Sequence, residues 1–329
     1  MLIYPMRWPR LFDSLAVLIA AALCAPAWAQ TYPVKPVRIV VPYVAGGATD
    51  VYARVVGRGL TDQLGQQFVI ENRPGAATII GAQAVAQAPK DGYTLLFTVS
   101  ATLSANPHLY KQLSYKADDF APVGLMGTSH GWTIAVHPSV PAKSIKEFVA
   151  FAKARPSQLV MGSLGPGTGP FLVGKTFERL AGLNFTEVSY KGSAEAMRDL
   201  LAGHIAMYCD GIAGALQQHK AGKLRILAIT GPRRSPELPD VATLLESGYA
   251  DLVVTNWWGL FAPAGTPADI VTRLNAAMVK TVERDDFRAR LANDGVNAES
   301  STPAVLGDMI KRDTAIWRRI IEPLRINLG

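Results

Sequence analysis

Short apolar runs alternate with segments of helical spacing along most of this 329-residue chain, and this alternation limits the folds that it can adopt. The runs that we predict as strands are Val37–Val41, Thr94–Val99, Thr133–Val136, Leu159–Gly162, Glu187–Tyr190, Ile205–Cys209 and Leu224–Ile229. The segments that we predict as helices are Asp50–Leu64, Ile79–Ala88, Ser144–Ala154, Leu172–Ala181, Ala194–Ala202, Pro267–Glu283 and Pro303–Ile320. Strands that alternate with helices are typical of α/β proteins with mainly parallel sheets, so we predict that class.

The N-terminus has the pattern of an export signal. Arg7 and Arg10 precede the apolar run Leu15–Ala25, and Ala27–Ala29 has the small-x-small form of a cleavage site. The apolar run is shorter than the about 20 residues that a membrane anchor needs. We therefore predict that residues 1–29 are a signal peptide and that the mature periplasmic chain begins at Gln30.

Charge and cysteine content exclude several classes of protein. The formal net charge of +7 falls to +6 once Arg7, Arg10 and Asp13 leave with the signal. The charges are scattered and form no nucleic-acid motif, so we expect no nucleic-acid partner. Cys209 is the single cysteine of the mature chain, which excludes an internal disulfide, and we expect it to be buried and structural.

The common signatures of hydrolases and metal sites are absent from the sequence. There is no G-x-S-x-G elbow, no H-E-x-x-H and no cysteine pair for zinc. The histidines lie far apart without ligand spacing, at His108, His130, His137, His204 and His219. We therefore expect no catalytic residue, no metal and no cofactor, although a triad assembled in space stays open.

Two stretches have the character of crossings between domains. Phe120–Val136 and Val253–Pro267 each combine an extended apolar run with aromatic residues and glycine, and they bracket a central insert. Two crossings predict two lobes, one formed by residues 30–128 plus 258–329 and the other by residues 129–257. Ligands of such α/β proteins bind beyond the carboxyl ends of the strands, which places the expected site in the cleft between the lobes.

A glycine pair, Gly46-Gly47, separates the predicted strand Val37–Val41 from the helix that follows it. The first N–H groups of such a helix are unpaired and lie at the positive end of its dipole, which makes the turn a candidate anion site. Thr49 or Asp50 is the expected N-cap. The alternative is a structural turn that binds nothing.

Similar chemistry recurs in the second half of the chain. Gly162–Pro170 and Ser189–Ala196 are further strand-to-helix turns, with Ser193 as an expected cap, and Asp210-Gly211 ends another predicted strand. Each turn alone is ordinary loop chemistry. Several of them, divided between two lobes, are what an anion held between opposed helix N-termini would need.

Gly169–Thr176 matches the phosphate-loop pattern G-x-x-x-x-G-K-[ST] letter by letter. A phosphate loop must follow a strand directly, whereas the preceding predicted strand ends at Gly162. Val173 and Phe177 continue a helical stripe with Thr168 or Gly169 as the cap, which predicts a helix and a surface position for Lys175. We therefore reject nucleotide binding.

Seven segments in order closely resemble the Bug family of periplasmic solute-binding receptors, the type that serves tripartite tricarboxylate transporters. The match covers nearly the whole mature chain. The segments are VPYVAGGATDVYAR (Val41–Arg54), ENRPGAATIIGAQAVAQAPKDGYTLL (Glu71–Leu96), NPHLYKQLSY (Asn106–Tyr115), DFAPVGL (Asp119–Leu125), AGKLRILAIT (Ala221–Thr230), LPDVATLLESG (Leu238–Gly248) and WGLFAPAGTP (Trp258–Pro267).

The resemblance implies a type II-like periplasmic binding protein, in which two Rossmann-like domains are joined by two crossing strands and close on a small carboxylate. Carried over residue by residue, it implies that the ligand contacts are Tyr43, Val44, Ala45, Gly46, Gly47, Asp50, Ser100, Ala101, Thr102, Ser163, Gly167, Thr168 and Asp210. Asp210 is an unusual partner for a carboxylate. It would accept from an amine or hydroxyl of the ligand, or orient a loop.

Two departures from the family pattern leave the identity of the ligand open. Phe171 and Lys175 stand where family members carry His and Glu, and Gln217 and Gln218 replace a Pro-His pair. The first hypothesis is a monomeric, non-enzymatic carboxylate receptor that works with membrane transporter subunits. The alternatives are an exported α/β enzyme acting on carboxylate esters or amides, and a ligand-sensing subunit of a membrane signalling protein.

Overall fold

The computed structural model of the chain describes residues 32–326 and 328. The proposed signal peptide and Gln30 lie outside these residues. The described residues from Lys35 onward belong to one compact unit, which holds all the strands and helices below. Within the described residues, no helix combines the length and the apolar character needed to span a membrane.

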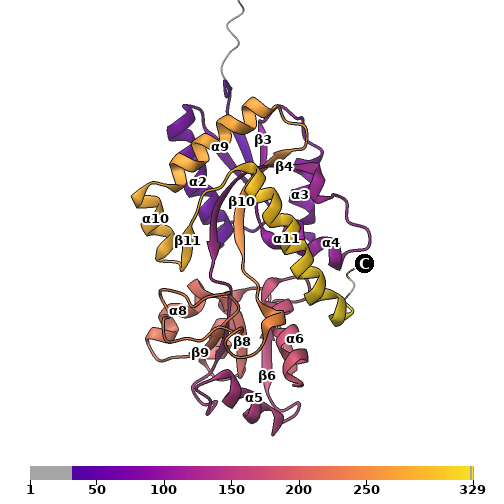
Figure 1. The fold of residues 1–329 in the computed structure, drawn as a ribbon, viewed down its shortest axis with the longest axis vertical. Helices are drawn as coiled ribbons and strands as arrows, with labels where there is room; N and C mark the ends of the chain where they lie inside the picture. Colours follow the sequence, from indigo (N-terminus) through magenta and orange to yellow (C-terminus); the bar gives the residue numbers. More distant parts are fainter. Residues whose placement is uncertain (1–31, 327, 329) are drawn as a thin grey trace, which may run out of the picture. The chain divides into compact units, whose positions relative to one another are not determined.

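The first sheet is formed by strands from the two ends of the described chain (Figure 1). Its order is β11 (Val296–Ala298), β4 (Phe120–Ser129), β10 (Trp257–Pro263), β3 (Thr94–Val99), β1 (Val37–Val41) and β2 (Phe68–Asn72). β1 is parallel to β2 and β3, whereas β10 is antiparallel to β3 and β4, and β11 is antiparallel to β4.

The second sheet is formed by the middle of the chain. Its order is β7 (Thr186–Ser189), β6 (Val160–Ser163), β8 (Met207–Gly211), β5 (Trp132–Val136) and β9 (Arg225–Ile229). β6 is parallel to β7 and β8, and β5 is antiparallel to β8 and β9. The chain enters this sheet from β4 to β5 without a helix between them, and it returns to the first sheet at β10.

The α/β class is confirmed, but the expectation of mainly parallel sheets is wrong. The cause lies in the two segments expected to cross between domains. β10 runs back into the first sheet opposite to β3, and β5 lies between β8 and β9 opposite to both.

All seven predicted helices are present. They are α2 (Ala48–Leu64), α3 (Ile79–Ala86), α5 (Ile145–Lys153), α6 (Gly169–Ala181), α7 (Ser193–Leu201), α9 (Ala268–Val282) and α11 (Pro303–Ile321). The sequence reasoning missed α4 (Asn106–Leu109), α8 (Ile212–Lys220) and α10 (Asp285–Ala292). α10 was missed because it buries only Phe287 and Leu291, which gives it almost no apolar stripe.

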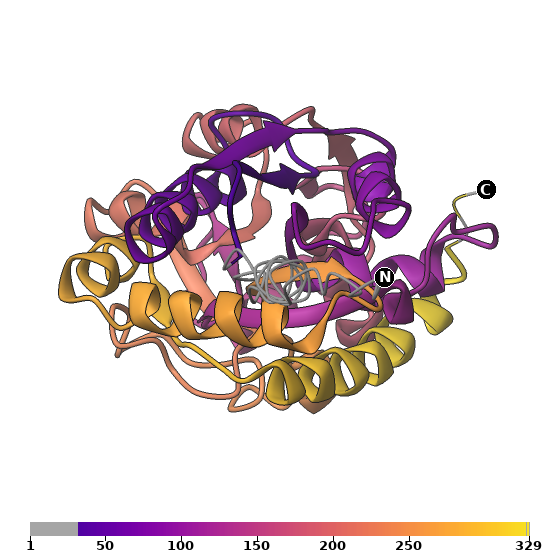
Figure 2. The same cartoon turned by 90° about the horizontal axis from the view of Figure 1, so that it is seen from above.

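Helices α2, α9 and α11 pack along the first sheet, and α9 and α11 both contact β4 (Figures 1 and 2). Tyr52, Val56 and Leu60 form the buried stripe of α2, as their spacing predicts. α2 and α9 approach closely at Gly59, where a Cβ atom would lie 2.1 Å from Cγ2 of Thr281. Any side chain larger than glycine would therefore push the two helices apart.

One hydrophobic cluster extends from the second sheet to helices that pack with the first. It contains Trp132 and Phe148 together with Leu109 of α4 and Trp317 of α11. The rings of Trp132 and Trp317 meet edge to face with centroids 5.9 Å apart. Buried aromatic pairs of this kind contribute about 0.5–1.5 kcal/mol beyond their buried area. The C-terminal helix therefore takes part in the cores of both halves.

Candidate functional site

The turn between β1 and α2 leaves several of its backbone N–H groups unpaired among the described residues. Gly46 has a φ of +83°, which favours glycine, and Gly47 is the N-cap of α2 with an extended φ of −76°. Among the described residues, the backbone N–H groups of Val44, Ala45 and Gly47 have no hydrogen-bond partner. These three donors remain available to a ligand.

Asp50 does not cap α2 as expected, because its carboxylate reaches back to the turn. It accepts from the Gly46 N–H at 2.9 Å, from Arg54 Nε at 3.0 Å and from Asn72 Nδ2 at 2.9 Å. Burial acts to raise the pKa of Asp50, but these donors together hold that pKa below its usual value. Asp50 thus fixes the turn, and it takes up the N–H of Gly46 in doing so.

A second predicted segment, Ser100 to Thr102, follows β3 and begins a π-helical turn, Ala101–Ala105. The Ser100 hydroxyl is fully buried and donates to Oδ1 of Asn256 at 2.8 Å. Burial raises the pKa of Tyr43, and a hydrogen bond with Thr102 opposes that rise. The structure therefore brings Tyr43 of the first turn together with Thr102 of this one.

In the second sheet, the turn after β6 is fixed by its own hydroxyl groups. The Ser163 hydroxyl donates to Oε1 of Glu187 at 2.7 Å and accepts from the Gly165 N–H at 3.0 Å. Thr168 donates to the Gly165 carbonyl and caps α6 by accepting from the Phe171 N–H, which confirms Thr168 as the expected cap. Both side chains are engaged within the protein, so the turn is preorganised.

Gly167, at the tip of that turn, lies against residues of the first half of the chain. A Cβ atom on Gly167 would be 3.7 Å from Cβ of Ala77, 3.8 Å from the Tyr110 hydroxyl and 3.3 Å from Cδ1 of Leu328. Ala77 belongs to the loop between β2 and α3. One predicted turn of the second half is therefore next to a strand-to-helix turn of the first.

The sequence reasoning missed this loop as a site candidate. Ala76, Ala77 and Thr78 have φ values of +45°, +48° and +80°, which are strained for residues other than glycine. Asn106 holds the loop by donating to the Ala77 carbonyl at 2.9 Å. Strain of this kind costs of order 1–3 kcal/mol per residue and clusters at ligand sites. Recognising β2 would have revealed the pattern of strand, turn and helix.

Asp210 ends β8 in a buried position beside the first turns of α7 and α8. Its Oδ1 accepts from the Gly211 N–H at 2.8 Å and from the Ser193 hydroxyl at 3.5 Å. Ser193 is therefore not the cap of α7, which is Gly192. Burial raises the pKa of Asp210 to about 6, against the effect of these two donors. No basic side chain of the described residues forms an ion pair with it.

The segment that matches the phosphate-loop pattern lies inside helix α6, as expected. Lys175, however, is only partly at the surface, since its side chain is 29% exposed. It pairs with Glu178, which is buried, and lies 3.8 Å from Glu187. The residues that could have curled around a phosphate are instead part of a helix whose lysine is held by carboxylates.

We expect Lys175→Ala to lower the free energy of unfolding by about 1–2 kcal/mol, because the buried Glu178 carboxylate would lose its cation. Ligand affinity should stay within about threefold, since Lys175 is outside the turns. Urea unfolding and calorimetric titration measure the two effects. The double variant Lys175→Met/Glu178→Gln is the control, and it should recover most of the lost stability. An unchanged stability of Lys175→Ala would contradict this role.

The described residues contain no group of three or more side chains suited to hold a metal ion. What the site offers is backbone N–H groups, helix N-termini and buried hydroxyls. The thirteen residues implied by the family resemblance are grouped at four strand ends, after β1, β3, β6 and β8. Such donors suit a small anion.

Comparison with known proteins agrees with this chemistry. BugT of Bordetella pertussis is 33% identical over 319 residues, covering 96% of this chain and 98% of that protein. MatC from Rhodopseudomonas palustris, solved with bound malate, is 32% identical with a TM-score of 0.78 and covers 88% of this chain and 100% of MatC. Rpa4515 of R. palustris, solved with adipate, is 31% identical with a TM-score of 0.81 and covers 90% of this chain and all of that one.

The family model described as the tripartite tricarboxylate transporter family receptor matches residues 52–326. This range includes the second sheet, every strand of the first sheet except β1, and the strand ends after β3, β6 and β8; β1 and the β1–α2 turn precede it. The family is one of receptors and not of enzymes, so the hypothesis of an exported esterase or amidase is set aside. The chain belongs to the tripartite tricarboxylate transporter receptor family.

Proposed function

We propose that this receptor captures a small aliphatic dicarboxylate between two lobes, one formed by residues 30–128 plus 258–329 and the other by residues 129–257. The observation that supports the proposal is that a Cβ atom on Gly167, in the turn after β6, would be 3.7 Å from Cβ of Ala77, in the loop between β2 and α3. Malate and adipate, the acids bound by MatC and Rpa4515, are both dicarboxylates.

The unpaired N–H groups of Val44, Ala45 and Gly47 supply donors for one carboxylate, with the positive end of the α2 dipole behind them. The N-terminus of α6, at Gly167 and Thr168, faces the other end of the ligand. The remaining ligand contacts in this proposal are Ser100, Ala101 and Asp210. Asp210 suits a hydroxyl on the ligand, such as that of malate, because it accepts a hydrogen bond in either protonation state.

Calorimetric titration of the purified protein with malate and with adipate tests this function. We expect saturable, reversible binding at one site per chain, with the acid recovered unchanged by mass spectrometry after prolonged incubation. Conversion of the acid, or hydrolysis of its methyl ester or amide, would restore the enzyme hypothesis. Absence of binding to any small carboxylate would refute the proposal.

The same function requires export and a membrane partner. The family points to transporter subunits as that partner, and a monomeric receptor in the periplasm would deliver its acid to them. The N-terminal pattern supports export, with Gln30 as the first residue of the mature chain. N-terminal sequencing of periplasmic protein should therefore read from Gln30. An intact Met1 or a lipidated Cys24 would contradict that processing.

A further inference from the structure

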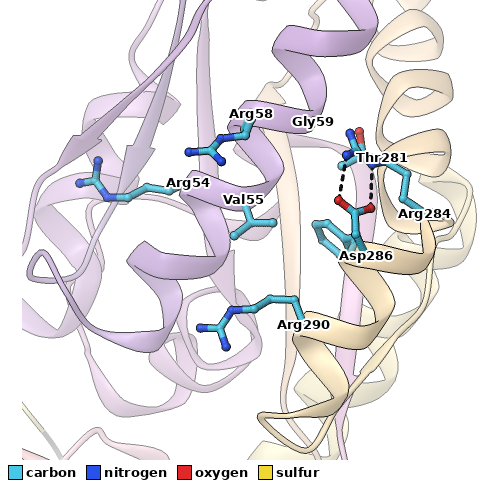
Figure 3. A pocket seen from close by; sticks show the side chains of 9 residues that line it. Arg54, Val55, Arg58, Gly59, Thr281, Arg284, Asp286 and Arg290 are labelled. Atoms are coloured by element: carbon cyan, nitrogen blue, oxygen red, sulfur yellow. Dashed lines mark hydrogen bonds and ion pairs between the residues drawn. The ribbon is translucent and has the colours of Figure 1, made fainter.

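A basic pocket lies on the first half of the molecule, beside helices α2, α9 and α10 (Figure 3). It has a volume of about 260 Å³ and is bordered by α2, the end of α9 and the start of α10. Val55, Thr281 and Phe287 contribute its apolar and hydroxyl wall. The carboxylate function described above does not use any of these residues.

The charges around this pocket are strongly unequal. Arg54, Arg58, Arg284 and Arg290 line it, against the single carboxylate of Asp286. Four guanidinium groups around one hollow repel one another unless anions compensate them. An excess of positive charge on this scale indicates a preference for an anionic occupant.

The four arginines differ in how far the protein already neutralises them. Arg284 forms ion pairs with Asp286 and Asp62, and Arg54 is engaged by Asp50. In contrast, Arg58 has no ion pair with a described carboxylate.

Among the described carboxylates, Arg290 pairs only with Asp294, at 3.6 Å. Arg58 projects from α2 and Arg290 from α10, on opposite sides of Val55 in the close-up (Figure 3). These two side chains are therefore the available anion ligands.

The helices that carry these arginines are well packed against one another. α2 and α9 are in contact at Gly59 and Thr281, and the Phe287 side chain that anchors α10 is only 4% exposed. Helices held in this way keep the backbone beneath the arginines fixed, so ligand binding need not order the backbone. A water molecule occupies about 30 Å³ in the liquid, so a pocket of this volume can hold several waters. The pocket therefore has space for a small oxyanion and part of its hydration shell.

We propose that this pocket is a second anion site, which takes a small multivalent oxyanion of the phosphate class, with Arg58 and Arg290 as its main cationic ligands. Guanidinium groups bind such anions through paired, charge-assisted hydrogen bonds. Val55 and Phe287 keep the inner side of the pocket apolar, which reduces competition from water. The pocket is linked to the β1–α2 turn through Arg54, which pairs with Asp50, whereas Arg58 and Arg290 form no hydrogen bond or ion pair with the described residues of that turn.

Calorimetric titration with inorganic phosphate, on protein saturated with its cognate acid, tests the proposal. We expect one phosphate per chain with millimolar or tighter affinity. The double variant Arg58→Ala/Arg290→Ala should weaken phosphate binding at least tenfold, since each charged hydrogen bond lost weakens binding by about one to two decades. The same variant should bind the carboxylate as the parent protein does.

The matched control is Arg233→Ala/Lys146→Ala, which removes two exposed positive charges from the other half of the chain. It should leave phosphate affinity within about threefold. An equal loss of phosphate affinity in both double variants would mean that phosphate responds only to the net charge of the protein, and it would overturn the proposal. Retention of full phosphate affinity by Arg58→Ala/Arg290→Ala, or no phosphate binding by the parent protein, would also overturn it.

Discussion

Gly47→Val should weaken binding of the cognate acid by one to four decades. Micromolar affinity corresponds to about −8 kcal/mol, and one hydrogen bond to a charged group contributes roughly 1.5–3 kcal/mol. A valine side chain at the N-cap would crowd an anion at the Val44–Gly47 donors, with loss of one or two such bonds. The fold itself should tolerate the change, because Gly47 has an extended φ of −76° and the nearest atom to its Cβ would be 3.6 Å away.

Gly307→Val is the matched control for that variant. It makes the same substitution in α11, where the nearest atom to the new Cβ would be 3.8 Å away. Circular dichroism and thermal melting should show that both variants fold. Titration with the acid should then show normal affinity for Gly307→Val and weak affinity for Gly47→Val. Equal, undiminished affinity in the two variants would mean that the glycine turn is only structural.

Asp210→Asn should raise the free energy of unfolding by about 3 kcal/mol at pH 8 and change it little near pH 4. Burial raises the pKa of Asp210 from 3.8 to about 6, and each pKa unit corresponds to about 1.36 kcal/mol. Between these values the native state holds a proton that the unfolded state has lost. The parent protein should therefore lose stability as pH rises from about 4 to about 6, and the Asn variant should not.

Urea unfolding from about pH 4 to pH 8 measures the effect, with the exposed Asp118→Asn as the control. Parallel pH profiles for Asp210→Asn and the parent would contradict it. Binding supplies a second readout, because an ionised Asp210 repels a carboxylate. Affinity for the acid should therefore increase as pH falls through about 6 in the parent and stay flat in Asp210→Asn.

Most of the fold could be predicted from local sequence because the strongest signals are local. Val37–Val41 and Thr94–Val99 are continuous apolar runs, and the structure confirms both strands as predicted. β2 was missed because its five residues end in Glu71 and Asn72, which breaks the apolar run. β11 has only three residues. Strand direction could not be predicted either, since β5 and β10 obtain their antiparallel partners from tertiary pairing.

The site was partly predictable for a related reason. Glycine and proline mark where a strand turns into a helix, so the turns at Gly46 and Gly167 are visible in the sequence. Hydrogen bonds between residues far apart in the chain cannot be predicted from the sequence in this way. The engagement of the Gly46 N–H by Asp50 and the support of Ala77 by Asn106 depend on side-chain orientation in the folded chain. The assignment of ligand contacts to these turns stays a prediction.

The central claim is that the turns at Gly47 and Gly167 hold a small carboxylate. The most direct measurement is mass spectrometry of the small molecules released when purified protein is denatured, with parent and Gly47→Val prepared in parallel. The parent should release one aliphatic dicarboxylic acid, at up to about one equivalent per chain, and Gly47→Val should release little or none. Release of the same acid in equal amount from both proteins, or of a ligand without a carboxylate, would contradict this claim.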